Sequence, residues 1–443
     1  MRATVLVSEY LIYIPAAIIL IRNLSRLRGI NKWKSSVALV AILMQPSTIL
    51  IDHAHFQYNT VMLGFVLASI SSMLAGRSLW GCVFFVAALS FKQMALYYAP
   101  AIFAYLLGSC LAPRLNIRRF VAIAGVTAVS FAVMFGPLLL GALYDSHRGI
   151  SPTPNLKTPP LPSYLSSLPI TLDTKAFYYP LLLQVTQSLH RIFPFARGLF
   201  EDKVANAWCV IHTVHKLNRY SIPLLQRASL TATFISILPT LITISYFPRR
   251  ELLPWAMAST AWGFYLCSFQ VHEKSVLLPL LPMTVLLGGE AGLGIEIRAW
   301  VGWANLLGCW TLFPLLKRDE LRVPYFVLSL LWAYLLGLPP TSLSLYFGRQ
   351  SRKGGLSMPI KILHLGFYTA MVAWHFVEAF VEPPQGKPDL WVVLNCIIGA
   401  VGFVVCLLWC SWQLILRSGV MDEYLGFRMR VESEKKNERK KKQ

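Results

Sequence analysis

Four short polar strings carry the side chains of this chain that could do chemistry. They cover residues 52–59, 91–93, 193–203 and 270–274, and their candidate substrate-binding side chains are His55, Gln57, Lys92, Arg197, His272 and Lys274. Arginine presents a planar pair of donors and lysine presents a point charge, and both suit an anionic phosphate group. The four strings therefore predict a site that binds a phosphate-bearing substrate.

A metal site is the competing interpretation of the first string, which contains Asp52, His53 and His55. Histidines two residues apart point the same way on a strand but not on a helix. No Cys-x-x-Cys or Glu-x-x-His pattern accompanies them to complete a set of zinc ligands. The sequence favours phosphate binding by cations, and we expect no metal and no other cofactor.

The composition places such a site in or beside a membrane. Of the 443 residues, 56% are hydrophobic and 14% are charged, whereas soluble domains carry about 25% charged residues. The 41 Lys and Arg residues outnumber the 20 Asp and Glu residues, but they lie in short clusters between apolar runs. This pattern is typical of membrane proteins and argues against nucleic acid as a partner. The expected phosphate is therefore that of a membrane lipid.

About thirteen apolar runs approach the roughly 20 residues that a spanning helix needs. They lie near residues 3–21, 36–51, 60–75, 79–91, 94–112, 119–143, 228–246, 252–270, 275–292, 298–315, 325–346, 360–380 and 391–416. We expect an all-α polytopic membrane protein with spanning helices in 1–143 and 228–416, a long loop over 144–227 and a basic tail over 417–443. The loop is expected to hold interfacial or re-entrant helices. Prolines within the runs are expected to kink or break their helices; they are Pro46, Pro100, Pro282 and Pro339.

Basic clusters between the runs predict the orientation. They follow the first, fifth, seventh and eleventh runs and include Arg26, Arg118, Arg250 and Arg352. These odd-numbered connections share one face, which the positive-inside rule makes cytosolic. The C-terminus lies on that face, and Lys440 to Gln443 match a dilysine endoplasmic-reticulum retrieval signal. The four polar strings then face the lumen.

The polar strings are similar to those of the dolichyl-phosphate-glucose-dependent glucosyltransferases of the endoplasmic reticulum, which are multispan enzymes of the GT-C fold. The matching stretches are residues 51–59, 90–98, 193–206 and 270–274, in the same order and with the same spacing. Residues 92–96 and 198–206 resemble the branch of this family that adds the first glucose, and they differ from the branch that adds the second. The resemblance covers nearly the whole chain and implies a GT-C-type fold.

The resemblance implies an inverting α-1,3-glucosyltransferase of the endoplasmic-reticulum membrane. Its donor would be dolichyl phosphate glucose, and its acceptor would be the Man9GlcNAc2 oligosaccharide on dolichyl diphosphate. The leaving phosphate needs no general acid, but it needs positive charge as the bond breaks. Arg197, His272 and Lys274, with Lys92 behind them, are the expected cations. The acceptor hydroxyl needs a general base, which is normally a carboxylate.

The sequence departs from that family at its N-terminus. Members carry one more spanning helix and then a lumenal loop that holds the catalytic aspartate, and no residue here corresponds to it. Asp52, Glu201 and Asp202 belong to other motifs of the family, so the catalytic residue stays unknown. A shortened gene model, an alternative start and an inactive relative are the three explanations.

Two other functions remain open on the sequence alone. A transporter or a lipid-flipping protein would carry polar residues along helix faces at mid-membrane depth, whereas here they gather at the ends of runs and in one loop. A non-catalytic membrane scaffold that still binds substrate would fit the missing aspartate. Glucose transfer remains the function that the polar strings favour.

Overall fold

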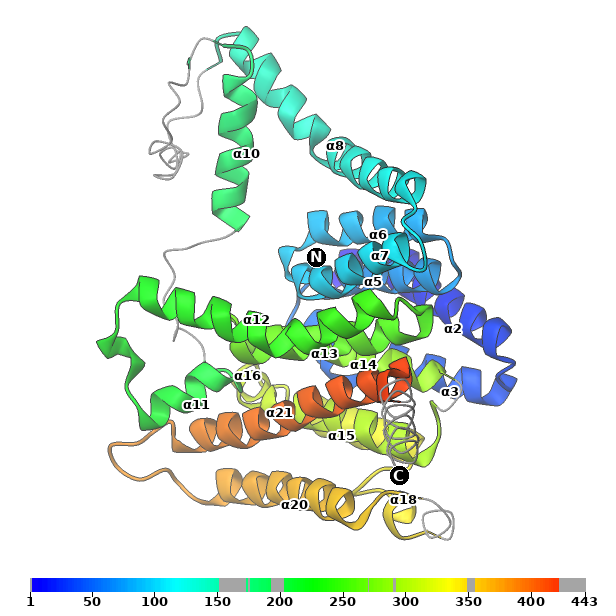
Figure 1. The fold of residues 1–443 in the computed structure, drawn as a ribbon. Coiled ribbons are helices and arrows are strands. Elements are labelled where there is room, and N and C mark those ends of the chain that lie inside the picture. Colours follow the sequence, from blue (N-terminus) through cyan, green and yellow to red (C-terminus); the bar gives the residue numbers. More distant parts are fainter. Residues whose placement is uncertain are drawn as a thin grey trace, which may run out of the picture.

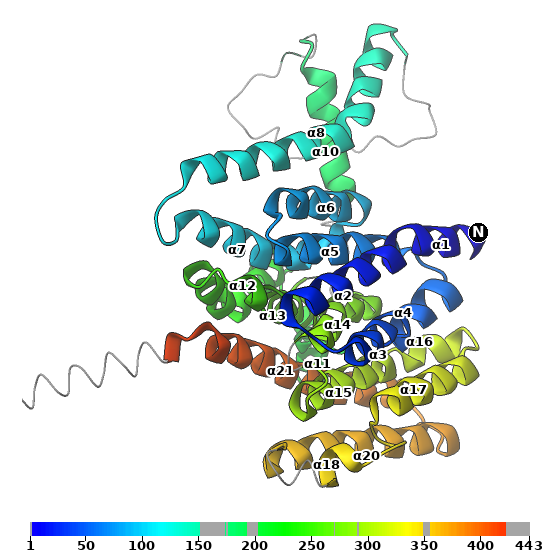
Figure 2. The same cartoon turned by 90° about the vertical axis from the view of Figure 1, so that its right-hand side faces the viewer.

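The computed structural model shows a helical bundle and describes residues 2–150, 173, 176–192, 203–269, 271–289, 292–348 and 355–421. Within these ranges every regular element is a helix. Figure 1 shows most of them stacked in layers, from α6 and α7 through α12 and α13 to α21 and finally α20. Figure 2 shows the same layers from the side, with α8 and α10 projecting beyond α6.

The N-terminal half begins with one long rod that is made of α1 (Arg2–Ser8), η1 (Glu9–Tyr13) and α2 (Ile14–Arg28). The rod ends where Gly29 takes φ 62°, a left-handed conformation that costs glycine little. The helices that follow are α3 (Lys32–Leu43), α4 (Pro46–Ile49), η2 (Leu50–Ala54), α5 (Asn59–Leu74), α6 (Ser78–Phe91), η3 (Gln93–Tyr98), α7 (Ala99–Leu111) and α8 (Ile117–His147).

The C-terminal half contains most of the buried helices. Its elements are α10 (Tyr179–Ile192), α11 (Ala207–Val214), η4 (Leu217–Arg219), α12 (Ile222–Tyr246), η5 (Arg250–Leu252), α13 (Leu253–Cys267), η6 (Glu273–Val276), α14 (Leu277–Val285), η7 (Leu286–Gly288), α15 (Ile295–Thr311), α16 (Phe313–Arg318), α17 (Arg322–Leu336), α18 (Ser344–Phe347), α20 (Met358–Phe380) and α21 (Leu390–Ser418). Each of the apolar runs found in the sequence coincides with one or more helices, and α10 and α11 lie within the long loop.

Seven helical segments in the described part of the chain are long and apolar enough to cross a membrane. They are Ala3–Leu27, Lys32–Ala54, Gln93–Leu111, Ile117–His147, Ile222–Tyr246, Met358–Phe380 and Leu390–Ser418. α5, α6 and α17 are shorter apolar helices, while nearly every residue of α13, α14 and α15 is buried against other helices. The prediction of an all-α, multi-pass membrane protein is therefore confirmed.

Pro46 breaks the second apolar run, as predicted, because α3 ends at Leu43 and α4 begins at the proline. Buried polar side chains lie beside this break and hydrogen-bond to one another. Gln45 Nε2 donates to Asn305 Oδ1 at 2.6 Å, and Asn305 Nδ2 donates to Thr284 Oγ1 at 3.0 Å. A broken helix at membrane depth is tolerated where protein surrounds it, as it does here.

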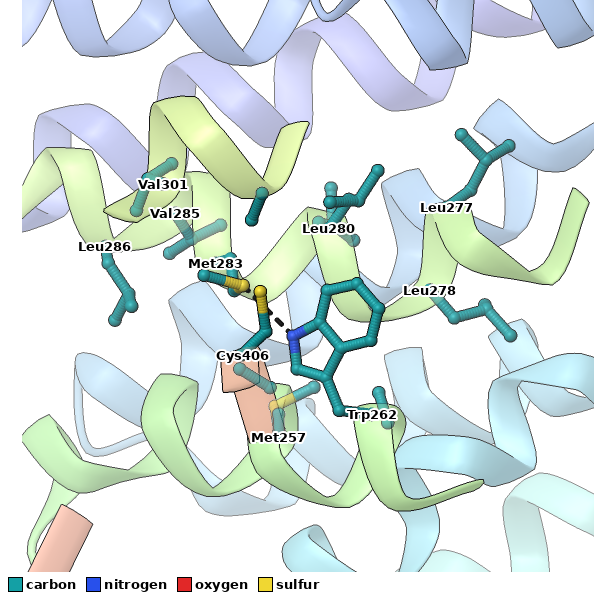
Figure 3. Close-up of a cluster of buried hydrophobic side chains, with 14 of the residues drawn as sticks. Met257, Trp262, Leu277, Leu278, Leu280, Met283, Val285, Leu286, Val301 and Cys406 are labelled. Carbon is teal, nitrogen blue, oxygen red and sulfur yellow. Dashed lines mark hydrogen bonds between the residues drawn. The ribbon is translucent and has the colours of Figure 1, made fainter. Parts of the chain in front are cut away.

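The centre of the bundle is packed with large side chains from α13, α14 and α21. Trp262 has no exposed surface, its ring stacks on Phe403 at a centroid distance of 4.7 Å, and its Nε1 donates to Met283 Sδ at 3.1 Å. Figure 3 shows this bond, with Met257 and Cys406 beside it. The indole thus fills volume while its N–H keeps a partner.

α8 leaves this bundle after its first turns. It packs on α6 and α7, and α10 packs along it. Ser130 is the single buried residue of the 31 in α8. A hydrophobic helix without protein around it is stable only if lipid covers it.

The crossing of α7 over α12 gives a direct test of this packing. A methyl group added at Gly108 would lie 2.3 Å from the carbonyl oxygen of Ser245, so Gly108→Ala should lower the free energy of unfolding by about 1–3 kcal/mol. Gly125→Ala is the control, since nothing lies within 4 Å of an added methyl there. Thermal unfolding of the purified chain in detergent measures both, and equal melting temperatures would contradict the described crossing.

Candidate functional site

Asp52 is the buried centre of the polar end of the bundle, by which we mean the end formed by η2, the start of α5, η3, η6 and the end of α16. Its side chain has no exposed surface. One carboxylate oxygen accepts the backbone N–H of Thr60, and the other accepts Nδ2 of Asn59 at 2.8 Å. The Gln57 N–H closes the turn by donating to the Asp52 carbonyl at 3.2 Å, with Phe56 at φ 71°.

Lys92 joins the second polar string to the first. Its Nζ donates to Asn59 Oδ1 at 2.6 Å, and the Asn59 amide also donates to Gln57 Oε1 at 3.3 Å. Burial lowers the pKa of the Lys92 ammonium, the negative charge of Asp52 opposes that shift, and the positive charge of Lys274 adds to it. Two lysines from different strings therefore lie within electrostatic reach of each other.

Lys274 brings a second lysine to this corner of the polar end. It lies in η6 between Glu273 and the buried Ser275, and the ion pairs that join described residues do not include it. Asp52 is the carboxylate that most affects the neighbouring Lys92, and both of its oxygens are already bonded. Lysine side chains of this kind can bind an anionic group.

His53 and His55 point to different carboxylates. His53 Nε2 lies 2.5 Å from Glu9 Oε2 in η1, and His55 Nδ1 pairs with Asp319 after α16. In the described part of the chain, no group of three or more His, Cys, Asp or Glu side chains is placed to hold a metal ion. The histidines of the first string therefore tie η2 to its neighbours.

Two ion pairs and one tryptophan side chain connect the third polar string and the C-terminal helices to the polar end. Lys317 at the end of α16 pairs with Glu378 of α20, and Lys203 pairs with Asp389 before α21. The Trp208 Nε1 donates to the Cys267 carbonyl at 2.7 Å, which brings α11 to the end of α13. The region around Lys203 is thereby placed near the fourth string.

The structure describes five of the six predicted substrate-binding residues. Lys92, Lys274 and Gln57 belong to one connected cluster, whereas His55 is directed to Asp319. His272 is the N-cap residue of η6, and its carbonyl accepts the Ser275 N–H at 2.9 Å. Arg197 lies outside the described residues, as do Glu201, Asp202 and Gln270.

Four acidic residues at this end were not singled out from the sequence. They are Glu9, Asp319, Glu378 and Asp389. A signal for three of them existed, since Asp319, Glu378 and Asp389 lie at or near the ends of apolar runs that finish on the same face as the polar strings. Nothing in the local sequence pairs any of them with its partner.

An apolar groove approaches the polar end from the membrane. It has a volume of about 520 Å³ and lies between α7, α12 and α13, with Pro100, Leu230, Phe234, Ile237, Phe264 and Ser268 among its lining residues. Tyr97 closes one side, with its ring 5.2 Å from that of Phe264 and its hydroxyl beside Ser268 and Ser275. Tyr97 thus connects Ser268, at the edge of the groove, to Ser275, the residue that follows Lys274.

Comparison with known proteins shows the family of this chain. The sequence matches the ALG6, ALG8 glycosyltransferase family over residues 1–151 and 167–410. The chain belongs to this family. Membership confirms the resemblance that the polar strings indicated.

Relatives within the ALG6, ALG8 family match along most of the chain. A dolichyl pyrophosphate Man9GlcNAc2 alpha-1,3-glucosyltransferase of Saccharomyces cerevisiae is 40% identical over 439 residues, which is 95% of this chain and 73% of the relative. The probable enzyme of the same name from Schizosaccharomyces pombe is 38% identical, over 94% of this chain and 71% of the relative. The enzyme of the same name from Gallus gallus is 34% identical, over 93% of this chain and 76% of the relative.

The Asp52 cluster should be essential for folding. Asp52→Ala would leave the Thr60 N–H and the Asn59 amide without their buried acceptor and would remove the negative charge that Lys92 faces, and we expect a loss of about 3–5 kcal/mol of unfolding free energy. Asp145→Ala in the exposed part of α8 is the matched control and should change stability by less than about 0.5 kcal/mol. Thermal unfolding in detergent measures both, and an Asp52→Ala protein as stable as the control would refute the cluster.

Proposed function

We propose that this protein transfers glucose, in α-1,3 linkage, to the Man9GlcNAc2 oligosaccharide carried on dolichyl pyrophosphate. The observation that carries the proposal is the match to relatives of that name, at 34–40% identity over 93–95% of this chain. The reaction is a step in assembling the precursor of N-linked glycans. The multi-pass fold suits it, because the acceptor is anchored in the bilayer by its lipid.

Dolichyl phosphate glucose is the donor in this proposal. Its glucose is β-linked to phosphate and the product bond is α, so a single displacement with inversion accounts for the change. The leaving phosphate develops negative charge in the transition state, and preorganised cations stabilise that charge more than they stabilise the ground state. Lys274 is the cation best placed to do so, with Lys92, His272 and Arg197 as further ligands of donor or acceptor phosphate.

The lipid chain of the donor has a place to lie. The groove between α7, α12 and α13 is lined mostly by apolar side chains, and Tyr97 connects its Ser268 edge to the residue that follows Lys274. A polyprenyl chain in this groove would deliver its phosphate to the lysine from within the membrane. His55 and Gln57, on the η2–α5 turn, would then contact the sugar side of the site.

Asp52 does not act as the general base in this account. The base must accept a proton from the acceptor hydroxyl and so must be within hydrogen-bond reach of it. The Asp52 oxygens are instead occupied by Asn59 and the Thr60 N–H, and the side chain has no exposed surface. Its role is to hold Lys92 and the η2–α5 turn in place.

We further propose that the polar end faces the lumen of the endoplasmic reticulum and that the C-terminus is cytosolic. Arginines gather at the opposite end of the bundle, in the turns after α5 and α12. Such clusters are retained on the cytosolic side of membranes.

Replacing Lys274 tests the proposed role of its charge. Lys274→Met keeps most of the side-chain volume and removes the ammonium, and we expect transfer to fall about 100-fold or more, the usual effect of losing one charge-stabilising donor. Lys216→Met, at an exposed position before η4, is the control. The assay is transfer of labelled glucose from dolichyl phosphate glucose to dolichyl-pyrophosphate-linked Man9GlcNAc2. Control-like transfer by Lys274→Met would remove this residue from the site.

Arg197→Ala and His272→Ala extend the test to the other predicted cations. Each should lose transfer while the melting temperature of the protein stays within a few degrees of wild type, since a ligand-binding cation contributes little to folding. Turnover like that of the wild type in both variants would exclude them as phosphate ligands. Donor binding without any transfer by the unmodified protein would favour the scaffold alternative.

A further inference from the structure

The end of the bundle opposite the polar end holds a second cationic cluster, apart from the site proposed for glucose transfer. We call it the arginine end and define it as the α5–α6 turn, the start of α8 and the α12–α13 turn. Here Arg77, Arg119 and Arg250 line one cavity of about 550 Å³. Among the described residues, no Asp or Glu lines this cavity.

Specific contacts hold two of the three arginines in place. Arg119 Nη2 donates to Ser78 Oγ at 3.2 Å, and its Nη1 donates to the Ser109 carbonyl at 3.3 Å. The Arg250 guanidinium lies against Gly76, where an added methyl would come within 2.8 Å of Nη1. Gly76 has φ 80°, a conformation and a spacing that both call for glycine. Residues of the α5–α6 turn, the start of α8 and the α12–α13 turn therefore form the cavity together.

The N-terminus of α6 adds a further positive contribution. Arg77 is its N-cap residue and makes no capping bond with its side chain, and residues 78–80 of the first turn line the cavity. The first N–H groups of a helix have no partner within the helix, so they favour an anion. Helix end and guanidinium groups converge on the same space.

The acidic residue next in sequence does not line this cavity. Glu251 follows Arg250 and lines a neighbouring cavity, which Arg250 and Arg417 also line. The side chain of Arg77 makes no hydrogen bond and no ion pair with the described residues. Guanidinium groups that share a cavity repel one another unless an anion balances them.

An apolar cavity continues from the cationic one. It measures about 450 Å³, lies between α6, α7 and α8, and is lined by Cys82, Phe85, Phe103, Phe120, Ala124 and further apolar residues. Ile123 lines both cavities. At the mouth, Trp80 is 58% exposed, as tryptophans at membrane–water interfaces commonly are. A ligand that fits both spaces has an anionic head and a hydrocarbon tail.

We propose that this site binds an anionic phospholipid whose headgroup ends in a phosphomonoester. Such a group carries about −1.5 to −2 charges at neutral pH, which suits several arginines better than the single charge of a phosphodiester. Basic pockets between membrane helices hold lipid headgroups by the same forces. The acyl chain lies in the apolar cavity beside α8, which the bundle itself leaves uncovered. The bound lipid thus fixes α8 against α6 and α7.

Titration of the purified full-length chain in detergent, followed by native mass spectrometry, tests the proposal. The probes are dioctanoyl phosphatidic acid, dioctanoyl phosphatidylcholine and inorganic phosphate. We expect saturable binding of phosphatidic acid that is at least about tenfold tighter than that of the other two, since both head and tail contribute. If phosphatidic acid binds no more tightly than phosphatidylcholine, the site does not select an anionic headgroup and the proposal fails. If inorganic phosphate binds as tightly as phosphatidic acid, the ligand is not a lipid and the proposal fails.

Variants locate the binding to this cavity. Arg77→Gln should weaken the binding of phosphatidic acid about fivefold, and the double variant Arg77→Gln with Arg250→Gln about 20-fold. The reason is that each cation near a lipid headgroup adds a similar increment of binding free energy.

Ala124→Trp places a large side chain of α8 in the apolar cavity, so it should weaken the binding of the lipid without changing the melting temperature of the protein. Arg114→Gln, an exposed arginine at the same end, is the control. Equal affinity in Arg77→Gln, Ala124→Trp and the control would contradict the proposal without bearing on glucose transfer.

Discussion

The buried carboxylate of Asp52 is the interaction on which the polar end depends. A charge taken out of water at membrane depth persists only with partners that replace its hydration. Here the Thr60 N–H, the Asn59 amide and, through Asn59, the Lys92 ammonium supply them. Because these groups come from the η2–α5 turn and from the end of α6, satisfying one charge fixes the two turns relative to each other.

That local order positions the chemistry. Lys92 is held by Asn59 and in turn lies near Lys274, so two lysines share one corner of the bundle. Other charged groups at this end form pairs, such as His53 with Glu9 and Lys317 with Glu378. In the proposed account, a donor whose lipid chain lies in the α7–α12–α13 groove would bring its phosphate to Lys274.

Under the two proposals made above, the cations at the two ends of the bundle bind different ligands. At the polar end, lysines sit beside amide and histidine side chains that suit sugar hydroxyls. At the arginine end, guanidinium groups meet a helix N-terminus and an apolar cavity. Each end thus presents a phosphate-compatible surface that continues into hydrocarbon, but with different chemistry around it.

The sequence predicted the helices well because hydrophobic runs report directly on lipid and core contact. It also placed Lys92 and Lys274 on one face, since the number of crossings between them fixes their side. The partners of His55 and Lys203 could not be predicted, because Asp319 and Asp389 are brought to them only by packing of helices far along the chain. The break at Pro46 was predictable, whereas its compensation by Asn305, 260 residues away, was not.

A cryo-electron microscopy structure of the protein with dolichyl phosphate glucose bound tests the central claim most directly. The account predicts density for the donor phosphate within hydrogen-bond distance of Lys274 Nζ, with the polyprenyl chain in the groove between α7, α12 and α13. Donor phosphate bound at the arginine end, or anywhere else away from Lys274, would contradict it.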